Sequence, residues 1–574
     1  MKLFNRALAV LLPSLLASFA AAQIAPGMFS NIIIIVQENR TPDNLFGLHA
    51  PPTTNNCGTL GDFPGADIVS TGMGNTSSNG TNYPCNAAYP MNAGQAQTPG
   101  HQQSDWLYDW NGGSMNQFCD QIYKAPCFPY SYVVSSPNTT DAMPYFLIAS
   151  NYGFANYMFQ TNEGPSYPAH QFLFSGTSAP VAPNDPNYYQ YFVVNNPSTT
   201  GNGTGGQSGC TQAVDLSWID PLRNVVTITG DGNSECYPHD SLVTGAVCTT
   251  GLAQCDKSTS LFSSSWRYYT PSPGNIWTAP ESIPEVCYGV NSSTAYPPPA
   301  TCGSASNNNL KNWKSHMSFY STESGAPILT DIANCQLQQI SWVIPDAAWS
   351  DHPNSSSGPA LGPYWVANIV DAIGNSYANS INSAQPCDYW GNVAPSGSTA
   401  RKPTAIFIVW DDWGGFYDHV APQNAWKGQV SGSGFSCGAP NGWGCGYIYG
   451  FRVPFLVVSE YTGASTSGGG YISGPCTPPN CPNLNPIYQH DFGSILAFTE
   501  FNFNLPKIAS PVYADNNALD AVGTNIPLSD FFPLCTPTCA GRSFFPIPVT
   551  NYPASFFKNY YATNNATPTG PDPD

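Results

Sequence analysis

Three short apolar runs stand out along the chain because each ends abruptly in polar residues. The runs, with the residues that follow them, are Ile32–Val36 with Gln37, Glu38 and Asn39, Ala405–Trp410 with Asp411 and Asp412, and Pro454–Val458 with Ser459 and Glu460. Continuous apolar runs rich in β-branched residues are typical of strands buried on both faces of a parallel sheet. A fourth run, "ISWVIP" from Ile340, leads towards Asp351 and His352.

Helical stretches between these runs indicate the fold class. Tyr364–Ser380 and Phe492–Phe501 have the length and apolar content of helices. Strands that alternate with helices predict an α/β fold, a doubly wound sheet with helices on both faces. In such a sheet ligands bind beyond the carboxyl ends of the strands. Glu38 and Asn39 are therefore expected at the active site.

The amino terminus is predicted to be an export signal. Lys2 and Arg6 precede an apolar stretch, and three alanines form a small-residue cleavage site that ends at residue 22. The apolar stretch is too short for a membrane span, and no later stretch reaches spanning length. We therefore predict a secreted protein, extracellular or periplasmic, without a transmembrane segment.

Composition divides the rest of the chain. We predict a catalytic domain over residues 23–507, with a cap or insertion rich in cysteine and proline at 181–310. A loop-rich tail is predicted over residues 508–574. Many of the 18 cysteines are close neighbours in sequence, such as Cys119 and Cys127, Cys437 and Cys445, Cys476 and Cys481, and Cys535 and Cys539. In an exported chain such cysteines are expected to form disulfides.

The charge balance argues against two classes of partner, nucleic acids and anionic membranes. The formal net charge is −19 and only 9% of the residues are charged. A surface this acidic repels nucleic acid and anionic membranes. If the substrate is an anion, a local cation must attract it.

The polar ends of two runs suggest such a cation. Glu38 and Asn39 follow one strand, and Asp411 and Asp412 follow another, so several oxygen ligands would meet at one edge of the sheet. Crowded carboxylates are costly there unless a cation binds them. Oxygen ligands favour Mg²⁺, Ca²⁺ or Mn²⁺, and a nearby histidine would admit Zn²⁺. The alternative is that these residues cap helices or are solvated loop acids.

A candidate nucleophile lies in "TNEGPSYPAHQFLFSGTS", which starts at Thr161. Gly164 and Pro165 form a turn, Ser166 follows, and a helix is predicted to continue through Phe174. A serine at a helix amino terminus is close to backbone N–H groups and to the positive end of the helix dipole, which favour a bound phosphoryl group. The alternative is an ordinary serine cap.

The eight histidines differ in their sequence settings. Four lie beside acids or turn residues and are candidates for general acid or base, or for metal ligand: His101, His352, His419 and His490. Three lack such a context and are assigned to the surface: His49, His239 and His316. His170 lies one turn beyond Ser166 and is assigned to packing or to support of the site.

Together these segments resemble a known family, the secreted phosphoesterases that include bacterial phospholipases C and a group of acid phosphatases. The similar blocks, in order, are "QENR", "GPSYPAHQFLFSGTS", "SDHP", "WDDWGGFYDHV", "GFRVPFLVVSE" and "HDFGSILAFTEFNF", within roughly residues 28–506. In the fifth block Arg452 has no firm role. The chain also has "SEYT" from Ser459 where the family often has a serine-proline pair, a difference expected to be minor.

The resemblance implies an alkaline-phosphatase-like fold and hydrolysis of a phosphate ester through a phosphoserine. The residues that it assigns to a divalent metal ion (Ca, Mg, Mn or Zn) are Glu38, Asn39, Ser166, Asp411 and Asp412. Ser166 would also be the nucleophile. His101 and His352 would act around the phosphate or the leaving group.

Several functions remain open on the sequence. The short tail after residue 506 favours an acid phosphatase of broad specificity over a phospholipase C, so the expected substrate is a small phosphate ester or else a phospholipid. A sulfatase is less favoured because "SYPAH" has His170 where the sulfatase pattern has arginine. A secreted binding protein without activity is disfavoured because the candidate nucleophile and ligands are all present.

Overall fold

The computed structural model describes a large part of the chain. The described residues are 24–47, 65–69, 99–118, 142–178, 266–272, 277–282, 316–353 with two single-residue gaps, 360–381, 386–391, 401–422, 449–463, 470–508 with two single-residue gaps, 513–533 with one, 541–569, and a few short pieces between them. The predicted signal peptide lies outside this part. None of the described helices is long and apolar enough to cross a membrane.

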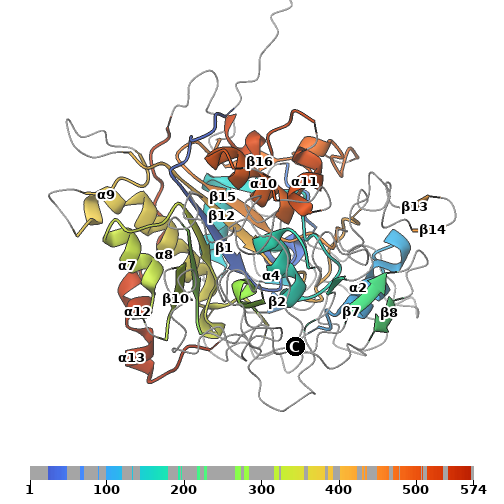
Figure 1. Ribbon diagram of the computed structural model, residues 1–574, viewed down its shortest axis with the longest axis horizontal. Helices are drawn as coiled ribbons and strands as arrows, with labels where there is room; N and C mark the ends of the chain where they lie inside the picture. The colour runs from blue at the N-terminus through green and yellow to red at the C-terminus, as the bar shows by residue number, and fades with distance from the viewer. Residues whose placement is uncertain are drawn as a thin grey trace, which may run out of the picture.

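A central sheet of eight strands organises the fold (Figure 1). Its strands, in spatial order, are β10 (Met317–Phe319), β9 (Trp266–Thr270), β11 (Ile340–Val343), β1 (Asn31–Gln37), β12 (Thr404–Trp410), β15 (Phe455–Val458), β4 (Gly153–Ala155) and β16 (Tyr471–Ser473). Every residue of β1 and of β12 is buried, which explains their continuous apolar sequence. The predicted α/β class is confirmed.

The first five strands are parallel, but β15 is not. β1 pairs in parallel with both β11 and β12, whereas β15 runs antiparallel to β12. The carboxyl end of the run at Pro454–Val458 therefore lies at the opposite end of the strands from the carboxyl ends of β1 and β12. Ser459 and Glu460 are consequently remote from the polar residues that follow those two strands.

Helices cover both faces of the sheet. In Figure 1, α7 (Pro327–Ala333) and α8 (Gly362–Gly374) lie on one side of the strands, and α4 (Ser166–Ser175) and α10 (Phe492–Phe503) lie on the other. The predicted helix over 364–380 is divided between α8 and the short α9 (Ser376–Asn379).

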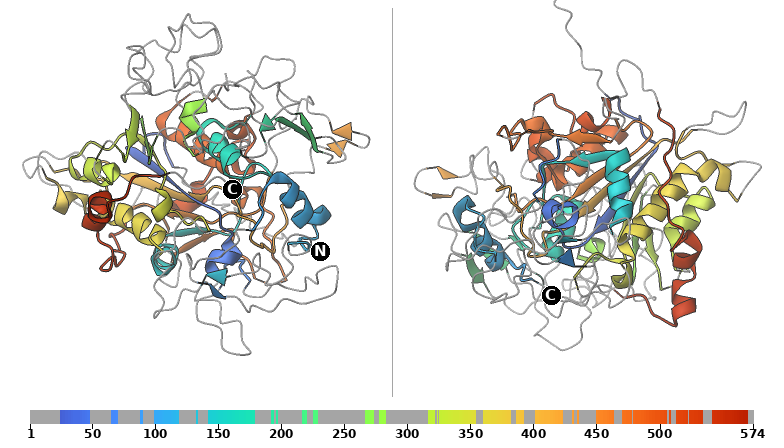
Figure 2. Two further views of the ribbon diagram at one scale, coloured as in Figure 1. Left: turned by 90° about the horizontal axis from the view of Figure 1, so that it is seen from below. Right: turned by 180° about the vertical axis from the view of Figure 1, so that it is seen from behind.

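The residues after 508 are part of this packing. α11 (Ala514–Asn517) packs on α10, and α12 (Ala554–Lys558) packs on α7 and α8. Figure 2 shows the carboxyl-terminal helices, in red, beside the yellow-green helices of residues 327–374. The predicted tail thus contains short helices joined by loops, and it contributes buried side chains such as Phe531 and Phe557 to the core.

The predicted insertion at 181–310 also supplies part of the core. β9 lies within it and pairs with β10 and β11 in the central sheet. Three short strands form a separate small sheet, namely β6 (Phe192–Val193), β7 (Leu216–Ile219) and β8 (Val225–Ile228). The exact limits of the insertion remain a prediction.

Two disulfides lie within the described residues. Cys476 pairs with Cys481, a pairing that the sequence alone left open. Cys335 pairs with Cys387 across 52 residues of sequence, and this joins the segment after α7 to the segment that precedes β12. The other close pairs, Cys119/Cys127, Cys437/Cys445 and Cys535/Cys539, lie outside the described part of the chain.

Candidate active site

Two neighbouring strand ends build the centre of the site. β1 and β12 are in register along their whole length, so Gln37 is opposite Trp410. The backbone pairing continues for one step, because Asp411 N donates to Gln37 O over 2.9 Å. Glu38, Asn39, Asp411 and Asp412 are all fully buried. The structure therefore brings the four residues together as the sequence predicted.

Asn39 adopts an unusual backbone conformation that holds this cluster. Its φ is +58°, in the left-handed region, and its backbone N–H donates to Asp411 Oδ1 over 3.0 Å. Gly414 packs directly against it, and a Cβ at Gly414 would lie 2.6 Å from Asn39 Cβ. The Gly414 N–H donates to Asp412 Oδ1. Glycine is thus required at 414 by both its own positive φ and this close approach.

Helix α4 brings two side chains to the same carboxylates. Ser166 is its first residue, and Ser166 Oγ lies within hydrogen-bond distance of Glu38 Oε2, at 3.3 Å, and of Asp412 Oδ2, at 3.1 Å, so either carboxylate can accept its one proton. One turn later, His170 Nε2 lies 3.1 Å from Glu38 Oε1 and 3.7 Å from Asp411 Oδ2. Burial lowers the pKa of His170 to about 4, although Asp411 opposes the shift. The imidazole is therefore neutral at neutral pH.

The sequence assigned His170 only to packing or to support, yet it contacts the carboxylates directly. Residues four apart on a helix lie on the same face. Because Ser166 was already a candidate, that spacing was the signal that could have placed His170 in the site. Its ring also stacks on Trp277, at 6.2 Å between centroids. Trp277 belongs to the predicted insertion and was not singled out.

His101 and His352 flank the cluster. His101 Nε2 is 3.1 Å from Asn39 Nδ2, and its Nδ1 is 3.0 Å from Pro99 O. His352 Nδ1 is 2.7 Å from Pro353 O. The two rings lie 6.2 Å apart, edge to face. Backbone carbonyls at both Nδ1 atoms favour the tautomer protonated on Nδ1, which makes Nε2 the basic nitrogen of each ring.

Comparison with known families bears on this arrangement. The model of the phosphoesterase family matches residues 29–384 and 395–506. The chain belongs to the phosphoesterase family. The resemblance seen in the sequence is thereby confirmed, and membership supports the predicted class of enzyme, a phosphoric ester hydrolase.

Curated relatives of this phosphoesterase-family protein are similar over shorter stretches. Non-hemolytic phospholipase C of Burkholderia pseudomallei is 29% identical over 181 residues, which are 30% of this chain and 20% of the relative. Hemolytic phospholipase C of Pseudomonas aeruginosa is 26% identical over 184 residues, 30% and 19%. Phospholipase C B of Mycobacterium tuberculosis is 29% identical over 144 residues, 23% and 22%. The matches thus span about a fifth of each relative's length.

The residues of the site fit a divalent cation. Within the described part of the chain, Asp411 Oδ2 and Asn39 Oδ1 are buried and have no hydrogen-bond partner. Since Asn39 Nδ2 faces His101, the amide oxygen Oδ1 of Asn39 is available as a ligand atom for an ion. Three buried carboxylates are held close together, and such an arrangement is costly unless a cation compensates it.

The remaining residues of "QENR" hold the loop that carries His352. Gln37 Oε1 accepts from Asp351 N at 3.0 Å. Arg40 donates through both Nε and Nη2 to Asp351 O, at 3.0 and 2.6 Å, and its Nη1 reaches Asn44 Oδ1. The Asp351 carboxylate accepts from Tyr145 and from Trp410, the last residue of β12. Residues that flank the predicted ligands therefore position His352.

His419 and Arg452 belong to a different, structural cluster. Arg452 is fully buried and donates to both oxygens of Asp418, at 2.8 and 2.9 Å. His419 bridges Asp43, at 2.8 Å, and Asp67, at 3.1 Å. The two cations offset most of the charge of the three carboxylates, so the group does not need a metal. The candidate His419 is thus placed in a charge network that ties four segments together.

This network predicts a pH dependence of stability. Burial lowers the pKa of His419, but the Asp43 carboxylate and the hydrogen bonds to Asp43 and Asp67 outweigh it and raise the pKa to about 10. Because the folded pKa exceeds the unfolded value of about 6.5, the charged histidine stabilises the fold below about pH 6.5, and this contribution is lost as pH rises to 10. We expect His419→Gln to lower the free energy of unfolding at pH 6.5 by about 2–4 kcal/mol.

The check is chemical unfolding of both proteins at pH 6.5, 8 and 10. The difference in free energy of unfolding between the natural protein and His419→Gln should become steadily smaller as pH rises. A difference that stays constant over this range would contradict a charged His419.

Two other histidines lie in structural settings. His490 is buried between Asp520, 2.7 Å from Nδ1, and Ser473, 2.7 Å from Nε2, and neither partner belongs to the site. The surface assignment of His316 is wrong. His316 is buried, stacks on Trp266 at 4.4 Å and has Nδ1 2.7 Å from Trp266 O. His49 and His239 lie outside the described residues.

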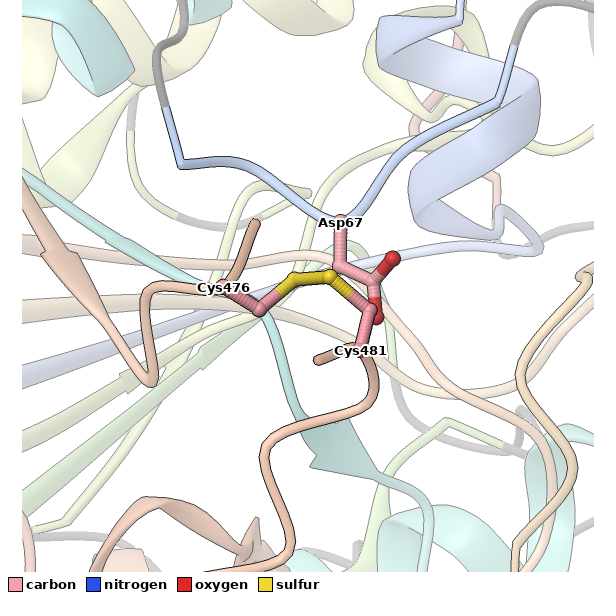
Figure 3. Close-up of side chains that lie close together, drawn as sticks. All are labelled: Asp67, Cys476 and Cys481. Atoms are coloured by element: carbon pink, nitrogen blue, oxygen red, sulfur yellow. A yellow bond between two sulfur atoms is a disulfide. The ribbon is translucent and has the colours of Figure 1, made fainter. Parts of the chain in front are cut away.

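A third group of potential ligands carries no metal site. Asp67 lies against Cys476 and Cys481, as Figure 3 shows. The two sulfurs are joined in a disulfide and are not available as thiolate ligands. Asp67 is already paired with His419. The group around Ser166 therefore remains the best-supported candidate metal centre among the described residues.

Proposed function

We propose that the protein is a secreted, metal-dependent phosphoric ester hydrolase that works through a phosphoserine. The observation that carries the proposal is the position of Ser166 Oγ, between Glu38 and Asp412 at the first residue of α4. Family membership supports it. Glu38, Asn39, Asp411 and Asp412 would hold a divalent cation, with Ser166 as a further ligand. When bound, the cation would neutralise phosphate charge and make the Ser166 hydroxyl a better nucleophile.

The protein's own residues would carry the remaining steps. Ser166 Oγ would lose its proton to solvent on binding the cation and would then attack phosphorus in line with the leaving oxygen, while the amino terminus of α4 stabilises the charge on the phosphoryl group. When water releases the phosphate, Ser166 Oγ is the leaving group and recovers its proton from solvent. His352 or His101 gives a proton to the leaving oxygen, and the same histidine then takes a proton from the water that releases phosphate. The Arg40 and Gln37 contacts hold His352 in place for both steps.

For the substrate we propose a phosphate monoester, as in an acid phosphatase of broad specificity. The second candidate is a phospholipase C acting on phospholipid head groups, and the observation in its favour is that the curated relatives named above are phospholipases C. The two candidates share Ser166 and the cation site. They differ in whether the phosphorus carries one or two ester groups.

One assay tests the metal and the substrate together. Purified, disulfide-bonded protein is tested on p-nitrophenyl phosphate and on p-nitrophenylphosphorylcholine, before and after removal of metal with a chelator. We expect turnover of the monoester to fall to about 1% or less without metal and to return with added divalent cation. Turnover of the choline diester alone would support the phospholipase C. Activity that resists complete metal removal would overturn the metal-dependent mechanism.

A further inference from the structure

We propose that His170 is a nitrogen ligand of the cation, so that the site takes Zn²⁺ or a first-row transition ion in preference to Ca²⁺ or Mg²⁺. The inference rests on the proposed function, which assigns a divalent cation to this site. It adds a residue that the family resemblance does not assign and narrows the class of metal.

The two carboxylate oxygens of Glu38 contact different residues, Ser166 and His170, which lie on one face of α4. Oε2 faces Ser166 Oγ at 3.3 Å, and Oε1 faces His170 Nε2 at 3.1 Å. Because Ser166 and His170 are four residues apart on α4, the same helix turn presents both donors to the same carboxylate. If Ser166 is a ligand, as proposed, His170 Nε2 lies at the same edge of the ligand set.

The distances around His170 suit a shared ion. Ligands about 2.1 Å from an ion lie roughly 3.0–3.4 Å from one another in octahedral or tetrahedral geometry. Nε2 is 3.1 Å from Glu38 Oε1, within this range, and 3.7 Å from Asp411 Oδ2, a few tenths of an ångström beyond it. A hydrogen bond from His170 to Glu38 alone would leave Asp411 Oδ2 buried without a partner among the described residues. An ion between the three atoms satisfies all of them.

The charge of the site and the packing of the His170 ring also support His170 as a ligand. Glu38, Asp411 and Asp412 already contribute three negative charges, so imidazole adds a ligand without adding a fourth. The ring of His170 stacks on Trp277 with 19° between the planes, and this contact fixes its orientation. An imidazole ligand shifts preference towards Zn²⁺ and transition ions, whereas Ca²⁺ and Mg²⁺ prefer oxygen.

The main alternative is a positioning role, in which His170 Nε2–H only orients Glu38. His170→Gln separates the two roles, because glutamine offers an N–H near the position of Nε2 but is a poor ligand for these ions. His170→Phe removes both functions. His316→Phe is the matched control, since His316 is also a buried histidine stacked on a tryptophan but contacts no proposed ligand.

The experiment uses full-length protein stripped of metal and reloaded with one ion at a time. Binding of Zn²⁺ and of Ca²⁺ is titrated, and the Cu²⁺-loaded proteins are compared by electron paramagnetic resonance. We expect both His170 variants to lose about 100-fold or more in Zn²⁺ affinity but less than about threefold in Ca²⁺ affinity. Nitrogen hyperfine splitting of the Cu²⁺ signal should be reduced in both variants and unchanged in His316→Phe.

Other outcomes would overturn the inference. If His170→Gln retains the Zn²⁺ affinity and the nitrogen splitting of the natural protein, His170 is not a ligand. Equal losses for Zn²⁺ and Ca²⁺ would indicate that it only orients Glu38. If the natural protein binds no divalent ion at all, the metal-dependent function fails as well, and this result is distinct from a site that binds metal through oxygen alone.

Discussion

Ser166→Ala will lower kcat for p-nitrophenyl phosphate by about 10⁴-fold or more while the protein remains folded. The reason is geometric, since Ser166 Oγ is the hydroxyl that lies against both Glu38 and Asp412. Alanine removes the nucleophile and one proposed ligand, and it leaves the carboxylates and α4 intact. Rapid acid quenching with ³²P-labelled substrate should label the natural protein on Ser166 and should leave the variant unlabelled.

Ser175→Ala provides the control from the same helix. Ser175 is the last residue of α4, is fully buried and has a hydroxyl without a hydrogen-bond partner among the described residues. Its replacement is expected to change kcat by less than about twofold and to leave the phosphoenzyme label in place. If Ser166→Ala kept near-natural turnover, or if the label stayed, the nucleophile would have to be another group.

Arg40→Lys will have its largest effect on substrates with poor leaving groups. Lysine cannot reproduce the two hydrogen bonds that converge from Arg40 Nε and Nη2 on Asp351 O, so the loop that carries His352 is expected to shift. A displaced general acid matters most when the leaving oxygen is strongly basic. We expect kcat/KM for β-glycerol phosphate to fall about 100-fold and that for p-nitrophenyl phosphate to fall less than about tenfold.

Arg542→Lys is the matched control. Arg542 lies over the ring of Tyr152 and donates to Gly463 O, far along the chain from the residues of the site. Its replacement should leave both substrates nearly unaffected. If Arg40→Lys lowered kcat/KM equally for the two substrates, Arg40 would act on the fold or on substrate binding in general, and its proposed role in positioning the acid would be wrong.

Strand position was accessible to sequence analysis, but strand direction was not. The buried runs at Ile32–Val36 and Ala405–Trp410 could be recognised because both faces of the sheet are covered. Their parallel pairing then places Glu38 beside Asp411. The sequence of an apolar run does not reveal the direction of its strand in the sheet, however, and nothing at Pro454–Val458 indicated that β15 runs antiparallel to β12. Direction is set by the connections between strands.

Side chains that depend on distant contacts were the ones missed. His316 has no informative neighbours in sequence, because its partner Trp266 is 50 residues away. Gln37 and Arg40 lie next to the predicted ligands, but their partner Asp351 is more than 300 residues away. His170 is different, because its helix face relative to Ser166 could be worked out locally. The helical repeat identifies which residues share one face of a helix. Which residues pack against that face can be seen only in the folded protein.

The aromatic packing around Trp349 has a practical consequence for the limits of an expression clone. Trp349 precedes the loop of His352 and contacts Phe557, Tyr560 and Tyr561. The backbone N–H of Thr569 donates to the Asp346 carboxylate, and Thr569 O accepts from the backbone N–H of Ala347. The family match ends at residue 506. A clone that ended there would lack the aromatic side chains that pack against Trp349, in the segment that leads to His352. The boundary of evolutionary similarity and the boundary of the folding unit are therefore different here, and affinity handles or fusion partners are best joined beyond residue 569 through a spacer.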